Sequence, residues 1–480
     1  MNNISASELN KPNAIQSPNK NLFPLLLVLT LVGLTLLAAI ILIIVFSCKK
    51  DKPHYINLNR KTKSNKPNII SMNYVIDEDN SETVLFHPSF IDSVESIKIN
   101  GENSNITNTK NLNKGNNEIE IKFKEDLTSL EDLFFMCNTL QEINLYNLST
   151  NKVTSTANMF YGCSNLKKVY LSEFNTKNIK NISNMFSGCS KLTSIDMNNF
   201  NNDKLIDIQG LFSDCRELKS LDLEDFNTNN VINMSKLFSG CTSLTEIDLN
   251  KTNNFNTENV EDMSYMFYSC EKLQNLNLEK FDTSKAVHMN NMFDGCVKLT
   301  SLNLNSFNTQ NVEDMFFMFG NCSNIESLNL SNFDTSKTMD MFGMFKDCAN
   351  LKNLEISSFD TSSVEDMGEM FGNCTNLNNI QVNNFDVKKV ESMLGMFEKC
   401  PGLTSLNLAN FDTNNLEEAS YLLSNCKNIK NLDMRKFNTL KLKNYENIFA
   451  NMSEDVNFIC DKKIFNISQN ITDTWNVTYV

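Results

Sequence analysis

Hydrophobic side chains recur with a period of 26 residues over most of this chain. Around Cys296, for example, Phe293 lies three residues before it, and Leu299, Leu302 and Leu304 lie three, six and eight residues after it. Twelve cysteines mark the period, and every step between neighbours is 26 residues except one of 29: Cys137, Cys163, Cys189, Cys215, Cys241, Cys270, Cys296, Cys322, Cys348, Cys374, Cys400 and Cys426. One unit cannot bury its own apolar side chains, so the pattern predicts units stacked around a shared core.

Each unit contains two local periods. The L-x-L motif alternates and predicts a very short strand with both leucines on one face. Met315, Met318 and Cys322 are spaced by three and four residues, which predicts a short helix with one apolar side. Asn311 lies three residues before Asp314, a spacing that resembles a helix capping box. We therefore expect an α/β repeat solenoid, a leucine-rich-repeat-like stack of short parallel strands and short helices, preceded by one transmembrane helix.

The regions outside the repeats predict an anchor and two caps. No charged residue lies between Lys20 and Lys49, and an apolar stretch of this length spans a bilayer, whereas the apolar part of a cleaved signal peptide is shorter. Alternation over Asn117–Lys124 predicts a strand that starts the ladder, and the three extra residues around Asn250–Asn254 predict a loop insertion. The predicted order is a polar tail (1–22), a transmembrane helix (23–47), a basic linker (48–68), an N-terminal cap (69–130), a solenoid of about 12 repeats (131–450) and a C-terminal cap (451–480).

Charge and residue types favour binding over catalysis. The net charge of −14 argues against nucleic acid as a partner, because phosphates require a basic face. Only three histidines occur, and no motif for a nucleophile, a metal or a cofactor is present, so we expect a protein that is not an enzyme and uses no cofactor. The cysteine ladder is interpreted as buried free thiols, because stacked equivalents have parallel Cα–Cβ vectors. Two alternatives stay open, a bridge from Cys460 and acylation of Cys48.

The repeats resemble leucine-rich repeats of the BspA-like surface-protein family. The matching signature is M-F-x-x-C-x-x-L-x-x-L-x-L-x-x-F-[DN]-T-x-x-V-x-x-M, as at Met318–Met341 and Met344–Met367. The resemblance covers roughly residues 130–450 and implies a cell-surface protein associated with adhesion. It favours a solenoid that faces outwards.

One row of the strands is the candidate partner-binding face. Its residues lie seven positions after each cysteine, between the two core leucines, and side chains alternate along a strand, so the row is expected to face solvent. They are Asn144, Tyr170, Asp196, Asp222, Asp248, Asn277, Asn303, Asn329, Glu355, Gln381, Asn407 and Asp433. Solenoids usually bind along such a regular face. Asp196, Asp222 and Asp248 are expected to be neighbours in the stack.

Two signals conflict over the side of the membrane. The basic residues that follow the anchor, from Lys49 to Lys66, favour a cytoplasmic solenoid. Possible N-glycosylation sequons favour an extracellular one: Asn147, Asn181, Asn233, Asn321, Asn329, Asn373, Asn451, Asn466, Asn470 and Asn476. The leading hypothesis is a single-pass surface protein that contacts membrane lipids through its anchor and binds proteins or glycans of another cell or matrix. The alternatives are a cytoplasm-facing scaffold that recruits partner proteins and a structural spacer.

Overall fold

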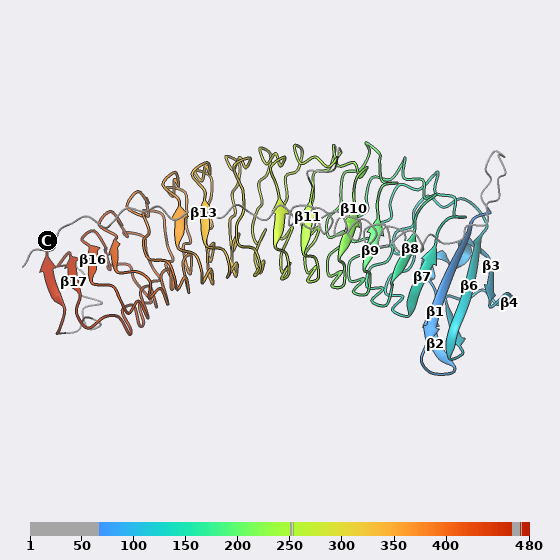
Figure 1. Ribbon diagram of the computed structural model, residues 1–480, viewed down its shortest axis with the longest axis horizontal. Helices are drawn as coiled ribbons and strands as arrows, with labels where there is room; N and C mark the ends of the chain where they lie inside the picture. Colours follow the sequence, from blue (N-terminus) through green and yellow to red (C-terminus); the bar gives the residue numbers. More distant parts are fainter. Residues whose placement is uncertain (1–66, 250–251, 253, 463–470, 472) are drawn as a thin grey trace, which may run out of the picture. The chain divides into compact units, whose positions relative to one another are not determined.

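The computed structural model describes residues 67–249, 252, 254–462, 471 and 473–480 (Figure 1). The chain divides into the units Met1–Ser64 and Asn65–Val480, and every described residue belongs to the second. The predicted polar tail, transmembrane helix and nearly all of the basic linker therefore lie outside the described residues. Within the described part, no helix is both long enough and apolar enough to cross a membrane.

The described chain begins with a mixed sheet, antiparallel except for the parallel pair of β7 and β8. It has the strand order β4-β3-β6-β1-β7-β8, and a separate antiparallel pair joins β2 and β5. The elements are β1 (Ile69–Ile76), β2 (Ser81–Val84), the 3-10 helix η1 (Pro88–Ser93), β3 (Val94–Ile99), β4 (Glu102–Ser104), β5 (Thr109–Leu112), β6 (Gly115–Phe123), β7 (Leu140–Asn144) and β8 (Lys168–Tyr170).

The strand expected over Asn117–Lys124 exists as β6, but it does not start the ladder. Strand β1 pairs with β7 of the first coil, and Met72 lies opposite Ile143. Strand β6 instead pairs with β1 on one side and β3 on the other. Its buried residues Ile119 and Ile121 suit this central place in the sheet. The expectation was wrong because alternation identifies a strand without identifying its neighbours.

From β7 onwards the chain forms a solenoid of about twelve coils (Figure 1). Each coil contributes at most one short strand to its strand layer, and paired strands are parallel and in register, with Leu328 opposite Leu354. The further strands are β9 (Ser194–Asp196), β10 (Ser220–Asp222), β11 (Glu246–Asp248), β12 (Asn275–Asn277), β13 (Ser327–Asn329), β14 (Asn353–Glu355), β15 (Ser405–Asn407), β16 (Asn431–Met434), β17 (Asn457–Cys460) and β18 (Asn476–Tyr479).

The strand layer is not the continuous ladder that the sequence predicts. Strands β9 and β10 form one pair, β11 and β12 a second, and β13 and β14 a third. Strands β15 to β18 form a four-stranded sheet at the end. A three-residue strand forms few ladder hydrogen bonds, so pairing between coils is easily interrupted. Another part of each coil must therefore hold the stack in register.

The predicted short helices are absent. The described residues contain no α-helix, and the segment from 312 to 322 is a series of turns. The Met318 and Cys322 N–H groups each donate to the carbonyl three residues earlier, over 3.1 and 3.3 Å. Phe317 and Asn321 have φ values of 49° and 54°. A residue in the left-handed region ends an α-helix, and two occur in this segment.

The same two left-handed positions recur through the coils, five residues and one residue before each cysteine. The position directly before the cysteine is often glycine, asparagine or aspartate, as in Gly188, Asn373 and Asp347, which are the residues that tolerate a positive φ. This composition was the available signal against a helix. The predicted apolar face is nevertheless correct, because Met315, Met318 and their equivalents are buried, and a series of three-residue turns produces the same spacing.

We call the eight residues before each cysteine, together with the cysteine, the turn ribbon. Alternate N–H groups of this ribbon donate to carbonyls of the next coil. Met315 donates to Asp340, Phe317 to Phe342 and Phe319 to Met344, over 2.9 to 3.0 Å. One-residue parallel bridges follow each other from Ser155 to Asn444 without interruption. The turn ribbon, rather than the strand layer, therefore joins the coils continuously.

Like side chains stack along the core. The Phe293, Phe319 and Phe345 rings lie 5.6 and 5.7 Å apart and nearly parallel. The Cys322 thiol donates to the Phe293 carbonyl of the preceding coil at 3.2 Å, and this bond recurs at other cysteines. All thirteen described cysteines, Cys460 included, are free and buried, in agreement with the interpretation of the ladder as buried thiols.

Threonines of the F-[DN]-T motif join the coils at a further point. Buried Thr283 donates from its hydroxyl to the carbonyl of Asn308 in the next coil and accepts from the N–H of the same residue, both at 2.8 Å. At the C-terminal end, the Trp475 ring packs against Phe449 and Phe458, with centroids 5.3 and 5.5 Å away. These contacts cover the apolar side chains of the last coils.

Gly343→Ala tests the turn ribbon against a helix. An alanine would add up to about 1 kcal/mol of stability in a helix. Gly343 has a φ of +60°, and a Cβ there would lie 2.4 Å from a carbon of the Phe317 ring. We expect the free energy of unfolding to fall by about 1–2 kcal/mol, measured by urea denaturation followed by circular dichroism.

Asn447→Gly is the matched control, because Asn447 is exposed and has a φ of 55° at the equivalent ribbon position. A glycine in a helix interior costs about 0.5–1 kcal/mol relative to alanine, whereas here it should be nearly neutral. A stabilising Gly343→Ala would contradict the turn ribbon.

Candidate partner-binding faces

The predicted row of the strand face lies on the solvent side of the strand layer, as the alternation of side chains along a strand predicts. None of its twelve residues is buried, since eight are exposed and Tyr170, Asp248, Asn277 and Asp433 are half-buried. Of the two apolar residues that flank each row position, the second is buried, as Leu330 is, whereas the first is only half-buried in several coils, as Leu221 and Leu276 are. The row is therefore available to a partner along the strand layer.

A groove of about 810 Å³ lies in this face over β10, β11 and β12. Its lining includes four residues of the predicted row: Asp222, Asp248, Asn277 and Asn303. Leu221, Ile247 and Leu276 supply apolar surface between them. Thr252, from the three-residue insertion, also lines the groove, and its hydroxyl donates to the Leu249 carbonyl at 2.8 Å. The groove and the insertion thus occur in the same part of the stack.

The groove is predominantly acidic. Carboxylates of Asp222, Glu224, Glu246 and Asp248 line it, and Lys219 is the lysine among its lining residues. Asp222 lies directly opposite Asp196 in the paired strands β9 and β10, and like charges that face each other across strands repel. Asp222 and Asp248 lie in successive coils and line the same groove, as neighbours in the stack, although β10 and β11 do not pair. The groove favours a ligand that carries positive charge.

A second row of polar side chains lies on the turn ribbon, eight residues before each cysteine from Cys163 onwards and, in the last coil, eight residues before Met452, which takes the place of the cysteine. We call it the cap row. At most of its positions a side-chain oxygen accepts the backbone N–H two residues further on, so Asp314 accepts from Phe316 at 2.9 Å and Asp340 from Phe342 at 2.8 Å. The row comprises Ser155, Asn181, Asp207, Asn233, Asp262, His288, Asp314, Asp340, Asp366, Ser392, Glu418 and Asn444. The sequence shows these acids, but the capping-box interpretation assigned them to helices.

Burial raises the pKa of several cap-row carboxyls. It does so at Asp207, Asp314, Asp340 and Asp366, and each carboxylate accepts a backbone N–H, which offsets part of the shift. At Asp340 the neighbouring charges of Asp314 and Asp366 raise the pKa further. The cap row therefore holds like charges close together in a half-buried setting.

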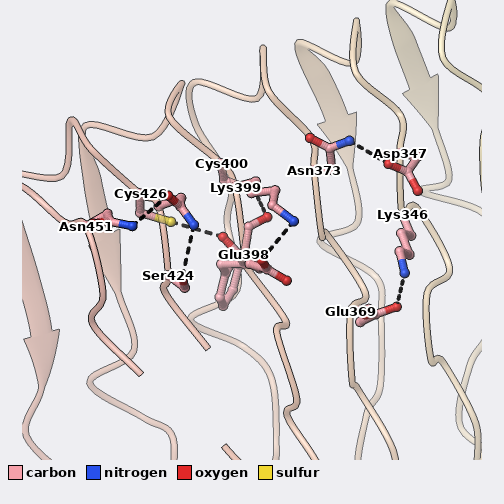
Figure 2. Close-up of polar contacts among 12 residues, drawn as sticks. Lys346, Asp347, Glu369, Asn373, Glu398, Lys399, Cys400, Ser424, Cys426 and Asn451 are labelled. Carbon is pink, nitrogen blue, oxygen red and sulfur yellow. Dashed lines mark hydrogen bonds and ion pairs between the residues drawn. The ribbon is translucent and has the colours of Figure 1, made fainter. Parts of the chain in front are cut away.

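The sequon asparagines divide into two structural groups. Asn181 and Asn233 are cap-row residues, and Asn373 donates its amide to Asp347 of the preceding coil at 2.5 Å, as Figure 2 shows. Asn321 makes the equivalent bond to Asp294. The exposed sequon residues are Asn147, Asn329, Asn451 and Asn476, while Asn466 and Asn470 lie outside the described residues. Asn451 and Asn476 also donate across coils, to Asn425 and Asn457, so exposure rather than the inter-coil network separates the two groups.

The described residues contain no cluster of three histidine, cysteine, aspartate or glutamate side chains arranged to hold a metal ion. The buried thiols also differ from metal-binding or reactive cysteines, which are partly exposed and have lowered pKa values. Burial raises the pKa of Cys348 to about 12.

Comparison with known proteins gives a family without an assigned function. Residues 128–251, 243–355 and 339–461 each match the family model described as "Mycoplasma protein of unknown function, DUF285". No curated protein matches the chain. That description does not name BspA-like proteins, so the resemblance stays an interpretation.

One solved structure, the crystal structure of a TLR13–ssRNA13 complex, aligns at 19% identity with a TM-score of 0.24. The alignment covers 71% of this chain and 50% of the other, so this chain spans about half its length. A TM-score of 0.24 is too low to establish a shared fold.

Asp340→Asn tests the electrostatic cost of the cap row. The raised pKa means that the folded protein binds this proton more tightly than the unfolded chain, so stability rises as pH falls through the folded pKa towards the ordinary value of 3.8. Asparagine keeps the cap, as Asn233 does in another coil. We expect the free energy of unfolding at pH 7 to rise by up to about 1 kcal/mol, with the gain shrinking towards pH 4.

Asp334→Asn is the opposite control. Hydrogen bonds from the Ser336 hydroxyl and N–H lower the pKa of Asp334, so its ionised form favours folding and its neutralisation should slightly destabilise the protein at pH 7. Urea denaturation of both variants at pH 4 and pH 7 measures the difference. A loss of stability in Asp340→Asn at pH 7 would contradict the assignment.

Proposed function

This chain belongs to the DUF285 family, and on that premise we propose that it is a non-enzymatic binding solenoid whose strand face holds an extended segment of a partner protein. One observation carries the proposal. The groove over β10 to β12 coincides with the row selected from the repeat pattern, and the insertion contributes to its wall. A regular face interrupted by a groove gives a repeat protein both a long contact surface and a point of specificity.

The groove also indicates the kind of segment. Its apolar surface comes from Leu221, Ile247 and Leu276, and its carboxylates outnumber its lysine. A volume of about 810 Å³ accommodates a few side chains. An extended segment with alternating apolar and basic residues would bury the first kind against the leucines and place the second beside the acids. Asparagine and serine side chains in the lining would bind its backbone.

We further propose that the solenoid is displayed on the outside of a cell by a single-pass anchor over residues 23–47, where it mediates adhesion to proteins or glycans of another cell or matrix. The BspA-like resemblance and the exposed sequons Asn147 and Asn329 support this location. The basic stretch from Lys49 to Lys66 favours the alternative, a scaffold that faces the cytoplasm and contacts anionic lipids.

Charge reversal in the groove tests the binding proposal. The probe is a fluorescein-labelled peptide of alternating leucine and lysine, titrated with the full chain in detergent micelles and followed by fluorescence anisotropy. The double variant Asp222→Lys, Glu246→Lys should weaken binding by at least about tenfold, because it replaces attraction with repulsion in a partly desolvated groove. A matched peptide of alternating leucine and glutamate should bind weakly to the native chain and more tightly to the variant.

Glu355→Lys is the matched control, since Glu355 belongs to the same row in β14 and lies outside the groove. It reverses a charge on the strand face and should leave the affinity within about twofold. An equal loss in this control, or no preference between the two peptides, contradicts the groove as the binding site.

Protease digestion of intact cells that express the full chain with a C-terminal epitope tests the location. External protease should remove the epitope, whereas a protected epitope that becomes digestible only after lysis supports the cytoplasmic scaffold instead. In a glycosylating host, Asn329→Gln should remove sugar and Asn181→Gln should remove none, because Asn329 is exposed and Asn181 is half-buried.

A further inference from the structure

Three phenylalanines form a cluster on the outer side of the turn ribbon. The Phe316 ring lies 4.8 Å from that of Phe317 and 5.6 Å from that of Phe342, and the Phe317 and Phe342 rings are 5.8 Å apart. All three are half-buried, in contrast to the fully buried core rings. We call these three residues the aromatic patch. The patch is an apolar surface on the turn ribbon that is separate from the stacked phenylalanines of the core.

The patch departs from the repeat. Phe316 and Phe342 occupy the position six residues before the cysteine, where most other coils have small or polar residues such as Ser264 and Ser420 and one has Leu394. Phe317 has a φ of 49°, but this position is left-handed in every coil, so the departure from the repeat is the phenylalanine side chain and not the backbone conformation.

Glycines in the following coils make room for the rings. A Cβ at Gly343 would lie 2.4 Å from the Phe317 ring, and a Cβ at Gly368 would lie 2.8 Å from the Phe342 ring. Each of these phenylalanine rings is thus accommodated by a glycine in the following coil. Such matching indicates a built surface rather than an isolated exposed ring.

Several carboxylates adjoin the residues of the aromatic patch. The cap-row residues Asp314 and Asp340 each bond the N–H of a patch phenylalanine, and Asp366 follows in the next coil. Exposed Glu313 and Glu365 each directly precede a cap-row aspartate of this stretch. Aromatic faces and carboxylates together attract a cation.

The chain already uses this chemistry with one of its own side chains. The Lys346 Nζ lies 5.8 Å from the centroid of the Phe317 ring, and the same ammonium pairs with Glu369. Figure 2 shows Lys346 directed at Glu369. Lys346 lies over the Phe317 ring, and no lysine or arginine of the described residues lies over the Phe316 or Phe342 ring.

Beside the patch, a buried acceptor has no donor among the described residues. The Asn291 side chain is 5% exposed, and its Oδ1 accepts no hydrogen bond. The Asn291 N–H donates to the Phe316 carbonyl at 2.8 Å, so it adjoins the patch. Its amide donates to Asp294, a buried carboxylate for which no ion pair is found within the described chain. Asp294 also accepts from the Asn321 amide, so the acceptor left without a donor among the described residues is the Asn291 Oδ1.

We propose that the aromatic patch and the adjoining cap-row carboxylates form a second docking surface, for an arginine-containing basic peptide segment of a partner. A guanidinium is planar, stacks on aromatic rings and donates to carboxylates at the same time, which matches the patch better than an ammonium does. This surface lies on the turn ribbon, whereas the groove lies on the strand layer, so the two proposals are independent.

Peptide binding to the full chain in detergent micelles tests the proposal. The probes are fluorescein-labelled peptides of alternating serine and arginine, serine and lysine, or serine and glutamate, followed by fluorescence anisotropy. We expect the arginine peptide to bind several-fold more tightly than the lysine peptide, and the glutamate peptide not to bind. The double variant Phe316→Ser, Phe342→Ser should weaken arginine-peptide binding by at least tenfold, and serine is native at this position in other coils.

Glu365→Lys provides a variant that leaves the packing intact, because Glu365 is exposed, and it should weaken binding several-fold. Tyr421→Asn is the matched control, since Tyr421 is an exposed ribbon aromatic beside the acids Glu417 and Glu418 but outside the patch, and it should leave affinity unchanged. Asp222→Lys should also leave it unchanged, and an equal loss there would assign the arginine peptide to the groove and overturn the proposal.

Two other outcomes would overturn the proposal. In the first, the phenylalanine variants and Glu365→Lys bind the arginine peptide as the native chain does. In the second, sedimentation shows that the native chain self-associates and that the phenylalanine variants do not, which would make the patch an interface between copies of this chain.

Discussion

The stack depends on hydrogen bonds between the turn ribbons of successive coils. Alternate N–H groups of one ribbon donate to carbonyls of the next, and the bridges run from Ser155 to Asn444 without a gap. Strand pairing in the opposite layer of the core is interrupted several times. Since buried backbone groups must be paired, the ribbon satisfies a requirement that the strands meet only in part. Stacked phenylalanines, thiols and threonines then add packing to a spacing that the ribbon sets.

The coil therefore has two outer surfaces, one on the strand layer and one on the turn ribbon. The strand layer presents one regular row, and its departure from regularity is the groove beside the insertion at Thr252. The ribbon presents the cap row, and its departure is the aromatic patch with its glycines. In a repeat protein the common residues maintain the stack, so the residues that break the pattern are the informative ones for function.

Much of the core followed from the sequence. The spacing around each cysteine identified Met318, Phe319 and Leu330 as buried, and the alternation of L-x-L placed Asn329 outwards. The helices predicted from the same spacing were wrong, because turns of three residues reproduce the intervals of a helix. Glycine and asparagine before the cysteines were a signal for the turns, and the capping-box interpretation of Asp314 obscured it. The aromatic patch was missed because Phe316 and Phe317 adjoin core positions in the sequence and resemble them.

The sequence by itself determined the period, the identity of the buried side chains and the row that faces solvent, since these depend on intervals within one unit. The tertiary structure decided whether the M-x-x-M-F segment forms a helix or a ribbon. That choice depends on whether an N–H finds its acceptor in its own turn or in a carbonyl of the next coil, 25 residues away, as Phe317 does with Phe342. It also decided which strands pair and which outward residues meet, because both follow from contacts between coils that no single repeat contains.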